Sequence, residues 1–369
     1  MMHENNRINK TQNMIIILNA VIGIEILTFP NVLASTMKTS GWITLLIAGL
    51  ISMILTVMVT KIALKYSDET IVEFGKELVP AFILKIICIL YFIAFTVKTG
   101  AALRSLIEVV RIFLLPRTPP QIVGVIMIIA IAHLARSGIE SMGRMYMIIT
   151  MVIIIPTLFI GIVLITQINF MNYLPAFRFS FKDLMTSLKE MPVNFSGFEL
   201  IFLFTVYIKN DKKGLLKYNV FAMLIVTVFY ISTYVIILGK QGVAMLSRQL
   251  VPTMAAMISI DIPNAFIENL DGIMMAIWIL LIFSSLTTFL FGGSVILSKM
   301  FKSKDSKAFV IPCIVIAYII ASIPQNYDQI IKFRLLILNR IEIVTTVIIP
   351  ILLFFIYLYK NRKEVKSSE

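Results

Sequence analysis

The sequence predicts an all-α polytopic membrane protein with ten transmembrane helices, arranged as a five-plus-five inverted repeat in which helices 1 and 6 are broken. Three observations lead to this prediction. The 369 residues are 59% hydrophobic and only 14% charged, about half the charged share of a soluble domain. Apolar runs of about twenty residues, the length that crosses a bilayer, recur along the chain. Two of these runs are interrupted by glycine and glutamate at corresponding places.

Windows of about 19 residues locate the expected spans. They are 13–35, 41–64, 80–114, 120–136, 144–168, 184–208, 215–239, 264–299, 307–324 and 334–359. The third and eighth are longer than a perpendicular helix requires, which predicts tilted helices or helices that extend beyond the bilayer. The expected organisation is a single transmembrane domain over 1–369, with repeat one at about 13–168, repeat two at about 184–359 and cytoplasmic tails at 1–12 and 360–369.

The distribution of basic residues predicts the orientation of these spans. Lys and Arg exceed Asp and Glu by 13, and the excess lies in short segments between apolar runs. With both termini in the cytoplasm, nineteen of the 33 basic residues lie inside and nine, among them Arg334, lie in outer loops. Since cytoplasmic loops are enriched in Lys and Arg, this bias favours cytoplasmic termini and an even number of spans. The scattered placement indicates no binding of nucleic acid.

Each of two spans carries a Gly-x-Glu triplet in mid-membrane, and the two copies are 174 residues apart. The residues concerned are Gly23, Ile24 and Glu25 in the first span, and Ser196, Gly197, Phe198 and Glu199 in the sixth. Because the sixth span is an odd number of spans beyond the first, the two run in opposite directions. Such a pair is typical of an inverted repeat whose first helices unwind near the bilayer midplane.

A break of this kind predicts a ligand site. An unwound backbone exposes N–H and C=O groups that hydrocarbon cannot satisfy, so it persists only where it lines a cavity for water or a ligand. The positive end of a half-helix favours a carboxylate, whereas freed carbonyls suit an ammonium group or a cation. A free amino acid carries both groups, so these seven residues are the predicted substrate-binding site. The alternative is structural, because glycine also permits close helix packing and glutamate can cap a half-helix.

Lys98 is the most deeply placed charge in the third span. A charge at this depth needs a compensating partner, and Glu25 or Glu199 could supply it. Lys98 is therefore a candidate either for a structural ion pair or for a charge that faces the cavity.

Further charged residues within the expected spans include Arg104, Glu108, Arg111, Asp271, Arg340 and Glu342. The first three share one helical face and are expected to form a ladder of ion pairs. Asp271 lies near the outer end of its span, where an ion-pair partner is a better expectation than a ligand. The last two are expected at the membrane interface.

The side chains indicate neither an enzyme nor a metal site. Cys88 and Cys313 lie in separate apolar runs and are expected to be buried, inert thiols. His133 stands alone at the end of the fourth span, and the sequence contains no nucleophile–histidine–acid set, metal cluster or glycine-rich phosphate loop. We therefore expect no catalytic residues, no metal and no cofactor.

Short motifs over nearly the whole chain resemble a known family. The stretch from Asn19 to Pro30 resembles the opening helix of the amino acid–polyamine–organocation transporters. The further motifs are Gly41-Trp-Ile-Thr-Leu-Leu46, Leu115-Pro-Arg-Thr-Pro119, Gly138-Ile-Glu140 with Arg144, Phe195-Ser-Gly-Phe-Glu199, Val251-Pro-Thr253, Phe266-Ile-Glu268 and Trp278. In this order they look like the endospore germination permeases, the B subunits of GerA-type nutrient germinant receptors.

The resemblance implies a ten-helix core similar to that of amino-acid transporters, in the inner membrane of a bacterial spore. It also implies assembly with an A subunit and a lipoprotein C subunit, and sensing of a germinant rather than bulk uptake. Two positions depart from the family pattern. Glu25 stands where a second glycine is common, and Asn269 stands where an arginine often follows Phe-Ile-Glu.

Three functions follow from these observations. The leading hypothesis is a germinant-binding membrane subunit that senses a small nutrient, an amino acid, and triggers spore germination. The first alternative is a proton-coupled amino-acid permease that uses the same glutamates. The second is a structural subunit, or one that conducts water or ions, without ligand binding.

Overall fold

The computed structural model describes residues 7–209, 212–260, 270–303 and 305–368, which are helical apart from turns, connections and one isolated bridge between Ile8 and Ile208. The first half contains α1 (Lys10–Val21), η1 (Ile24–Leu27), α2 (Phe29–Thr36), η2 (Lys38–Ser40), α3 (Gly41–Lys65), α4 (Ile71–Leu78), α5 (Ala81–Phe113), α6 (Pro120–Ser137) and α7 (Ile139–Thr166). The connection to the second half contains η3 (Phe170–Tyr173) and α8 (Phe181–Lys189).

The second half begins with four short elements: α9 (Met191–Phe195), η4 (Phe198–Leu200), α10 (Ile201–Phe204) and η5 (Thr205–Tyr207). It continues with α11 (Leu215–Leu246), α12 (Pro252–Ile258), α13 (Leu270–Met300) and α14 (Lys307–Ser322). The last segment is continuously helical: α15 (Tyr327–Phe333), η6 (Arg334–Leu338), α16 (Asn339–Glu342), η7 (Ile343–Ile348) and α17 (Ile349–Ser368). Here η1 to η5 are 3-10 helices, whereas η6 and η7 are π-helices.

Within the described residues, seven helices are long and apolar enough to cross a membrane. Two shorter apolar helices, Phe198–Tyr207 and Lys307–Ser322, accompany them. The outer helices also leave large apolar side chains uncovered; Ile126 and Ile129 on α6, for example, are 62% and 64% exposed. A soluble protein rarely exposes such a contiguous apolar surface. The prediction of an all-helical polytopic membrane protein is confirmed.

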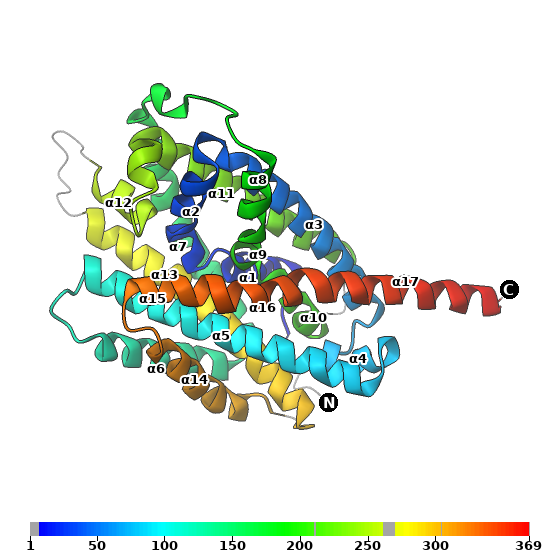
Figure 1. Ribbon diagram of the computed structural model, residues 1–369. Helices are drawn as coiled ribbons and strands as arrows, with labels where there is room; N and C mark the ends of the chain where they lie inside the picture. The colour runs from blue at the N-terminus through cyan, green and yellow to red at the C-terminus, as the bar shows by residue number, and fades with distance from the viewer. Residues whose placement is uncertain (1–6, 210–211, 261–269, 304, 369) are drawn as a thin grey trace.

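Two helices form the centre of the molecule. The most apolar stretch of α13 is 89% buried. This helix packs against α5, α14, α6, α1 and α7. The short helix α1 packs against α11, α7 and α13. Figure 1 shows the long segment from α15 to α17 crossing in front of this centre. The first half of the first span is therefore positioned by helices from both halves of the chain.

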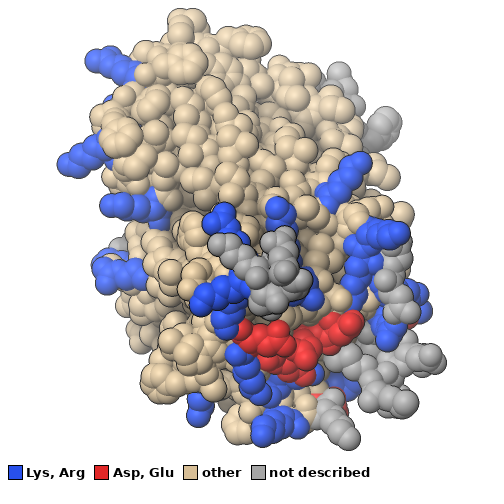
Figure 2. Space-filling view, turned by 90° about the vertical axis from the view of Figure 1, so that its right-hand side faces the viewer, with Lys and Arg blue, Asp and Glu red and all other residues tan. Residues whose placement is uncertain are grey.

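Basic side chains gather on the face shown in Figure 2, where they surround a small acidic patch. Lys212 pairs with Asp68 at 3.1 Å, and Lys299 pairs with Glu73 at 2.7 Å. Lys360 on α17 donates a hydrogen bond to a backbone carbonyl of α4. These contacts bring together segments that the basic-residue bias assigns to the cytoplasmic side, and the side of the membrane that they face stays a prediction.

Candidate functional site: two opposed helix breaks

The first break follows α1. The helix ends at Val21, Ile22 leaves the helical region with a ψ of 68°, and the N–H of Gly23 donates to the Val21 carbonyl at 2.8 Å. A Cβ on Gly23 would lie 2.8 Å from the hydroxyl oxygen of Ser285, so α13 approaches the backbone closely at this point. The helix is thus interrupted where the Gly-x-Glu triplet predicts it.

Hydroxyl groups from three other helices satisfy the carbonyls freed at the first break. Ser285 on α13 donates to the carbonyl of Ala20 at 2.9 Å, and Tyr230 on α11 donates to that of Val21 at 2.9 Å. Thr253 on α12 donates to a carbonyl of η1 at 2.7 Å. Unwound backbone in a membrane protein requires such partners, because hydrocarbon supplies none. The first break is therefore held by its tertiary surroundings.

The second break separates α9 from η4. Ser196 is extended, with a ψ of 141°, and Gly197 has a φ of 137°, a region that favours glycine. The carboxylate of Glu199 accepts hydrogen bonds from the Ser196 hydroxyl at 3.0 Å and from the Gly197 N–H at 2.8 Å. Glu199 is 1% exposed. It caps its own break, as the structural alternative for this residue predicts, and its charge lies at the positive end of the half-helix.

The two breaks lie directly against each other. A Cβ on Gly197 would lie 2.8 Å from Cγ2 of Val21, so the second break packs onto the end of α1. The Tyr230 hydroxyl lies between them and interacts with the carbonyls of Val21 at 2.9 Å and Asn194 at 3.1 Å, one from each broken span. The two triplets, far apart in sequence, therefore belong to one buried region.

Arg334 also connects the two broken spans. Its guanidinium donates to the Thr28 hydroxyl at 2.5 Å and to the side-chain oxygen of Asn194 at 2.9 Å. The expectation that Arg334 lies in an outer loop is wrong, because the last helical segment begins at Tyr327 and Arg334 starts its first π-helical part. Hydropathy started the expected span only at residue 334, because the polar residues from Tyr327 onward lower the mean of the window.

Lys98 reaches the second break from α5. Its Nζ donates to the carbonyl of Val193 at 3.0 Å and to that of Ser196 at 3.4 Å. The ammonium also lies over the Phe289 ring, 4.6 Å from its centre. The carboxylate in ion-pair range is Glu342 at 4.0 Å, rather than either glutamate of the two triplets. Lys98 is 4% exposed, so its charge is confined to this region.

The structure corrects the expectation that Glu342 lies at the membrane interface. Glu342 is 1% exposed and belongs to the interior of the last helical segment, which starts several residues before the expected span. Asn339, Thr345 and Thr346 are buried beside it. These residues lie three or four positions from Glu342, so they form one polar face on an otherwise apolar helix. That periodic polar face is the signal from which sequence reasoning could have found Glu342.

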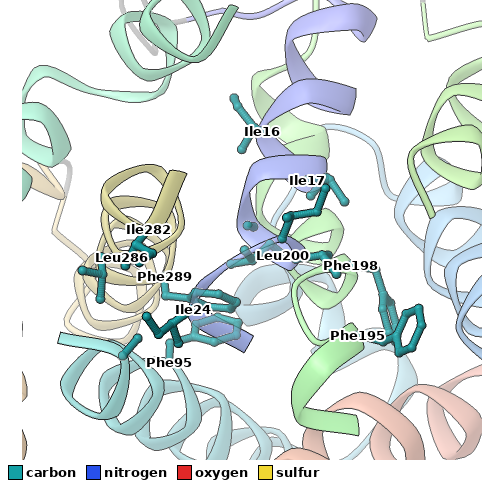
Figure 3. Packing of buried hydrophobic residues seen from close by; sticks show 14 of the residues in the cluster. Ile16, Ile17, Ile24, Phe95, Phe195, Phe198, Leu200, Ile282, Leu286 and Phe289 are labelled. Carbon is teal, nitrogen blue, oxygen red and sulfur yellow. The ribbon is translucent and has the colours of Figure 1, made fainter. Parts of the chain in front are cut away.

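Glu25 and the surrounding apolar side chains complete the buried region at the two breaks. Glu25 is 3% exposed, and its Oε2 has no hydrogen-bond partner among the described residues. In Figure 3, Ile24 lies on the same side as Phe95 and Phe289, whereas Phe198 lies on the side of the second break. Each of the seven predicted site residues is buried. The structure thus brings the predicted site residues together in a closed arrangement.

The three charges expected to form a ladder lie together on α5. Arg104 and Arg111 both pair with Glu108, at 2.6 Å and 2.7 Å, which confirms the predicted ladder. A cavity of about 290 Å³ adjoins Arg104 between α5, α6 and α14, and residues of neither break line it. The side chain of Asp271 lies outside the described residues. The motif Phe266-Ile-Glu268 and the departure at Asn269 also lie outside them.

The two cysteines behave as predicted. Cys88 and Cys313 are free and buried. Their burial in separate helices agrees with inert thiols rather than a redox pair.

Comparison with known proteins places this site in a family. A family model described as spore germination protein matches residues 7–330. The chain belongs to the spore germination permease family. This membership confirms the resemblance and the expectation that the chain is not an enzyme, since the family comprises receptor-like and transporter-like membrane proteins.

Individual relatives cover the chain almost completely. Spore germination protein YndE of Bacillus subtilis (strain 168) is 24% identical over 97% of this chain and 98% of its own length. Spore germination protein A2 of the same organism is 27% identical over 98% of each chain. Among solved structures, MhsT in complex with L-phenylalanine has a TM-score of 0.68 at 13% identity and covers 96% of this chain and 99% of that one. At this identity the likeness concerns the fold alone.

Proposed function

We propose that this protein is the germinant-binding integral membrane subunit, the B subunit, of a spore nutrient receptor. It senses a small nutrient, an amino acid, and triggers germination together with an A subunit and a lipoprotein C subunit in the spore inner membrane. Family membership supports the role in germination. The partners and the location follow from the resemblance of its motifs to GerA-type receptors.

The proposed architecture is one transmembrane domain of ten helices in an inverted five-plus-five repeat, with both termini on the core side. Two interrupted helical segments 174 residues apart support the repeat. The likeness of the fold to MhsT supports it independently. The clustering of basic side chains around the end of α17 supports the placement of the termini.

The observation that carries the proposal is that two helix breaks face each other in a closed, buried region. Glu25 has an unpartnered carboxyl oxygen there and would receive the ammonium group of the ligand. Glu199, which is occupied as a cap, would maintain the shape of the second break. The remaining predicted contacts are the backbone and side chains of Gly23, Ile24, Ser196, Gly197 and Phe198, with Lys98 as a nearby counter-charge.

Sensing requires the two broken spans to move, because the site is closed to the outside. Tyr230 and Arg334 each contact both spans. A ligand that binds between the spans changes how these two side chains connect them. The ligand shifts the protein from one arrangement of the spans to another only as far as its affinities for the two arrangements differ.

Germination of spores that carry Glu25→Gln tests the proposal. Loss of a charge-assisted contact of about 1.5–3 kcal/mol should shift the nutrient dose-response to concentrations about tenfold or more higher. Glu77→Gln is the matched control, since Glu77 is exposed on α4. Immunoblotting of spore membranes confirms equal amounts of each variant. An unchanged dose-response at equal protein level would reject the site.

A proton-coupled amino-acid permease is the second candidate. The fold of a transporter and the unpartnered carboxyl oxygens of Glu25 and Glu342 favour it. Accumulation of a labelled amino acid by vesicles that contain the purified chain alone would support transport. If variants at the breaks alter receptor assembly or ion leak without changing nutrient preference, a subunit that binds no ligand is the better description.

A further inference from the structure

Glu342 lies in the most irregular part of the last helical segment. The four residues of α16 separate the π-helical segments η6 and η7. Such segments are rare and occur frequently at functional sites. Within the described residues, neither carboxyl oxygen of Glu342 has a hydrogen-bond partner, although the side chain is 1% exposed. Buried polar groups are normally hydrogen-bonded, so this carboxyl group requires an explanation.

The charged and titratable groups that face Glu342 come from α5, η4 and η1. Lys98 on α5 lies 4.0 Å away, and Tyr91 on the same helix is an electrostatic neighbour. Glu199 on η4 and Glu25 on η1 act on Glu342 as like charges. The short helix α9, which also packs against α16, carries no titratable side chain. Among these described neighbours, Lys98 is therefore the cation that faces three carboxyl groups, in the interior of a membrane protein where uncompensated charge is costly.

Hydrogen bonding decides which of these groups is least able to remain ionised. Glu199 accepts two hydrogen bonds, one of them from Ser196. The Tyr91 hydroxyl donates to the carbonyl of Thr345 at 3.0 Å, so its proton is engaged. The Ser196 hydroxyl lies near Glu342, but its single proton goes to Glu199. It can offer Glu342 only a lone pair, which suits a protonated carboxyl group and repels an ionised one.

We propose that Glu342 is a proton-binding site. At rest, a proton resides on its carboxyl group, close to the Ser196 hydroxyl, whose own proton goes to Glu199. Lys98 and ionised Glu199 then balance each other, and Glu25 is left to meet an incoming cation. The inference concerns the protein without a nutrient, so it stands even if the proposed germinant site is wrong.

The proton on Glu342 also controls where the Lys98 ammonium lies. When Glu342 is neutral, the Nζ of Lys98 keeps the hydrogen bonds to the carbonyls of Val193 and Ser196 that the structure shows. Loss of the proton places an anion 4.0 Å from Nζ, and opposite charges attract strongly in a low-dielectric interior. Lys98 then leaves the carbonyls of the second break, which become available to another cation.

Infrared spectroscopy of the full chain in lipid vesicles, without nutrient, tests the inference. A protonated carboxyl group has a C=O stretching band that an ionised carboxylate lacks. We expect this band in the wild-type protein at neutral pH and its loss on titration to alkaline pH. Glu342→Gln should abolish the band, whereas Glu199→Gln should retain it.

Two further variants keep the test decisive if Glu342→Gln fails to fold. Glu342→Asp retains a carboxyl group and should retain the band. Lys98→Met removes the cation that favours the ionised form, so the band should persist to higher pH than in the wild type. The inference is overturned if the wild type lacks the band at neutral pH, if the band survives in Glu342→Gln, or if Lys98→Met leaves the titration unchanged. The germination response of Glu25→Gln is a separate measurement, so failure of either proposal can be recognised on its own.

Discussion

The two helix breaks carry the same Gly-x-Glu triplet and are stabilised in different ways. At the first break, the freed carbonyls accept hydrogen bonds from Ser285, Tyr230 and Thr253, each on a different helix. At the second break, Glu199 turns back and accepts hydrogen bonds from Ser196 and from the following backbone N–H. The first break therefore depends on the positions of α11, α12 and α13, whereas the second carries its own cap.

This difference shows that a shared motif does not determine a shared role. Glu199 is a cap, whereas Glu25 retains an oxygen without a partner among the described residues. A movement of α12 or α13 should alter the hydrogen bonds of the first break directly, whereas the local cap formed by Glu199 should move together with the second break.

The largest difference between the breaks is expected for alanine substitutions of their glycines. Gly197 has a φ of 137° and packs against Val21. Backbone strain and overpacking each cost about 1–3 kcal/mol, so Gly197→Ala should lower the free energy of unfolding by about 2–6 kcal/mol. Gly23 has a φ of −93° and faces the end of the Ser285 side chain, so Gly23→Ala should cost less. Unfolding of the purified variants in detergent measures both, and equal losses would contradict the comparison.

Removal of the hydroxyl group between the two breaks should have the next largest effect. Tyr230→Phe leaves the carbonyls of Val21 and Asn194 without this donor, which should cost about 1–3 kcal/mol. Tyr146→Phe is the control, because it removes a hydrogen bond of 2.7 Å to the Ser284 carbonyl on α13. Both should lower the unfolding temperature, but only Tyr230→Phe should shift the germination dose-response. Identical germination curves would argue against a role for the contact between the breaks.

Neutralisation of the two triplet glutamates should separate the cap from the unpartnered carboxyl group. Glu199→Gln replaces a charged acceptor of two hydrogen bonds by a neutral one and should cost about 1–2 kcal/mol. Glu25→Gln should leave the stability unchanged or raise it, since it removes a buried charge with an unpartnered oxygen. The free energies of unfolding of the two variants provide the measurement. A larger loss for Glu25→Gln would reverse the assignment of the cap.

The smallest expected effect on stability concerns the ion pair between Glu73 and Lys299 at the basic end of the molecule. This pair serves as a reference for both breaks. Burial alone would raise the pKa of Glu73, but the Lys299 ammonium and the N–H of Thr70 outweigh it and hold the pKa below its ordinary value of 4.5. Its contribution is therefore present above pH 4.5 and is lost as the pH falls through the lowered pKa. For a half-exposed pair this amounts to less than about 1 kcal/mol.

Thermal unfolding as a function of pH measures this contribution. Glu73→Gln should make the unfolding temperature less dependent on pH in the acidic range, with little change at neutral pH beyond the loss of the pair. Glu77→Gln, on the same helix but exposed, should keep the wild-type dependence. A steeper acid dependence in Glu73→Gln would contradict the direction of the pKa shift.

Features that depend on local order along the chain could be predicted from the sequence. Runs of apolar residues located the seven long apolar helices found among the described residues, because crossing a bilayer sets a minimum length. The ladder at Arg104, Glu108 and Arg111 could be predicted because positions three and four apart always meet on a helix. The two Gly-x-Glu triplets marked the breaks because the conformational freedom of a glycine is a local property that the sequence shows directly.

The partners of these features were decided only by the tertiary structure. Arg334 and Glu342 reach the buried region because the last helical segment crosses it, and no local pattern states which helices will be neighbours. Lys98 lies within 4.0 Å of Glu342 rather than of a triplet glutamate, and this depends on how α5 packs against α16. Local order along the chain thus determined where the backbone unwinds, whereas the packing of distant helices decided which charges meet there.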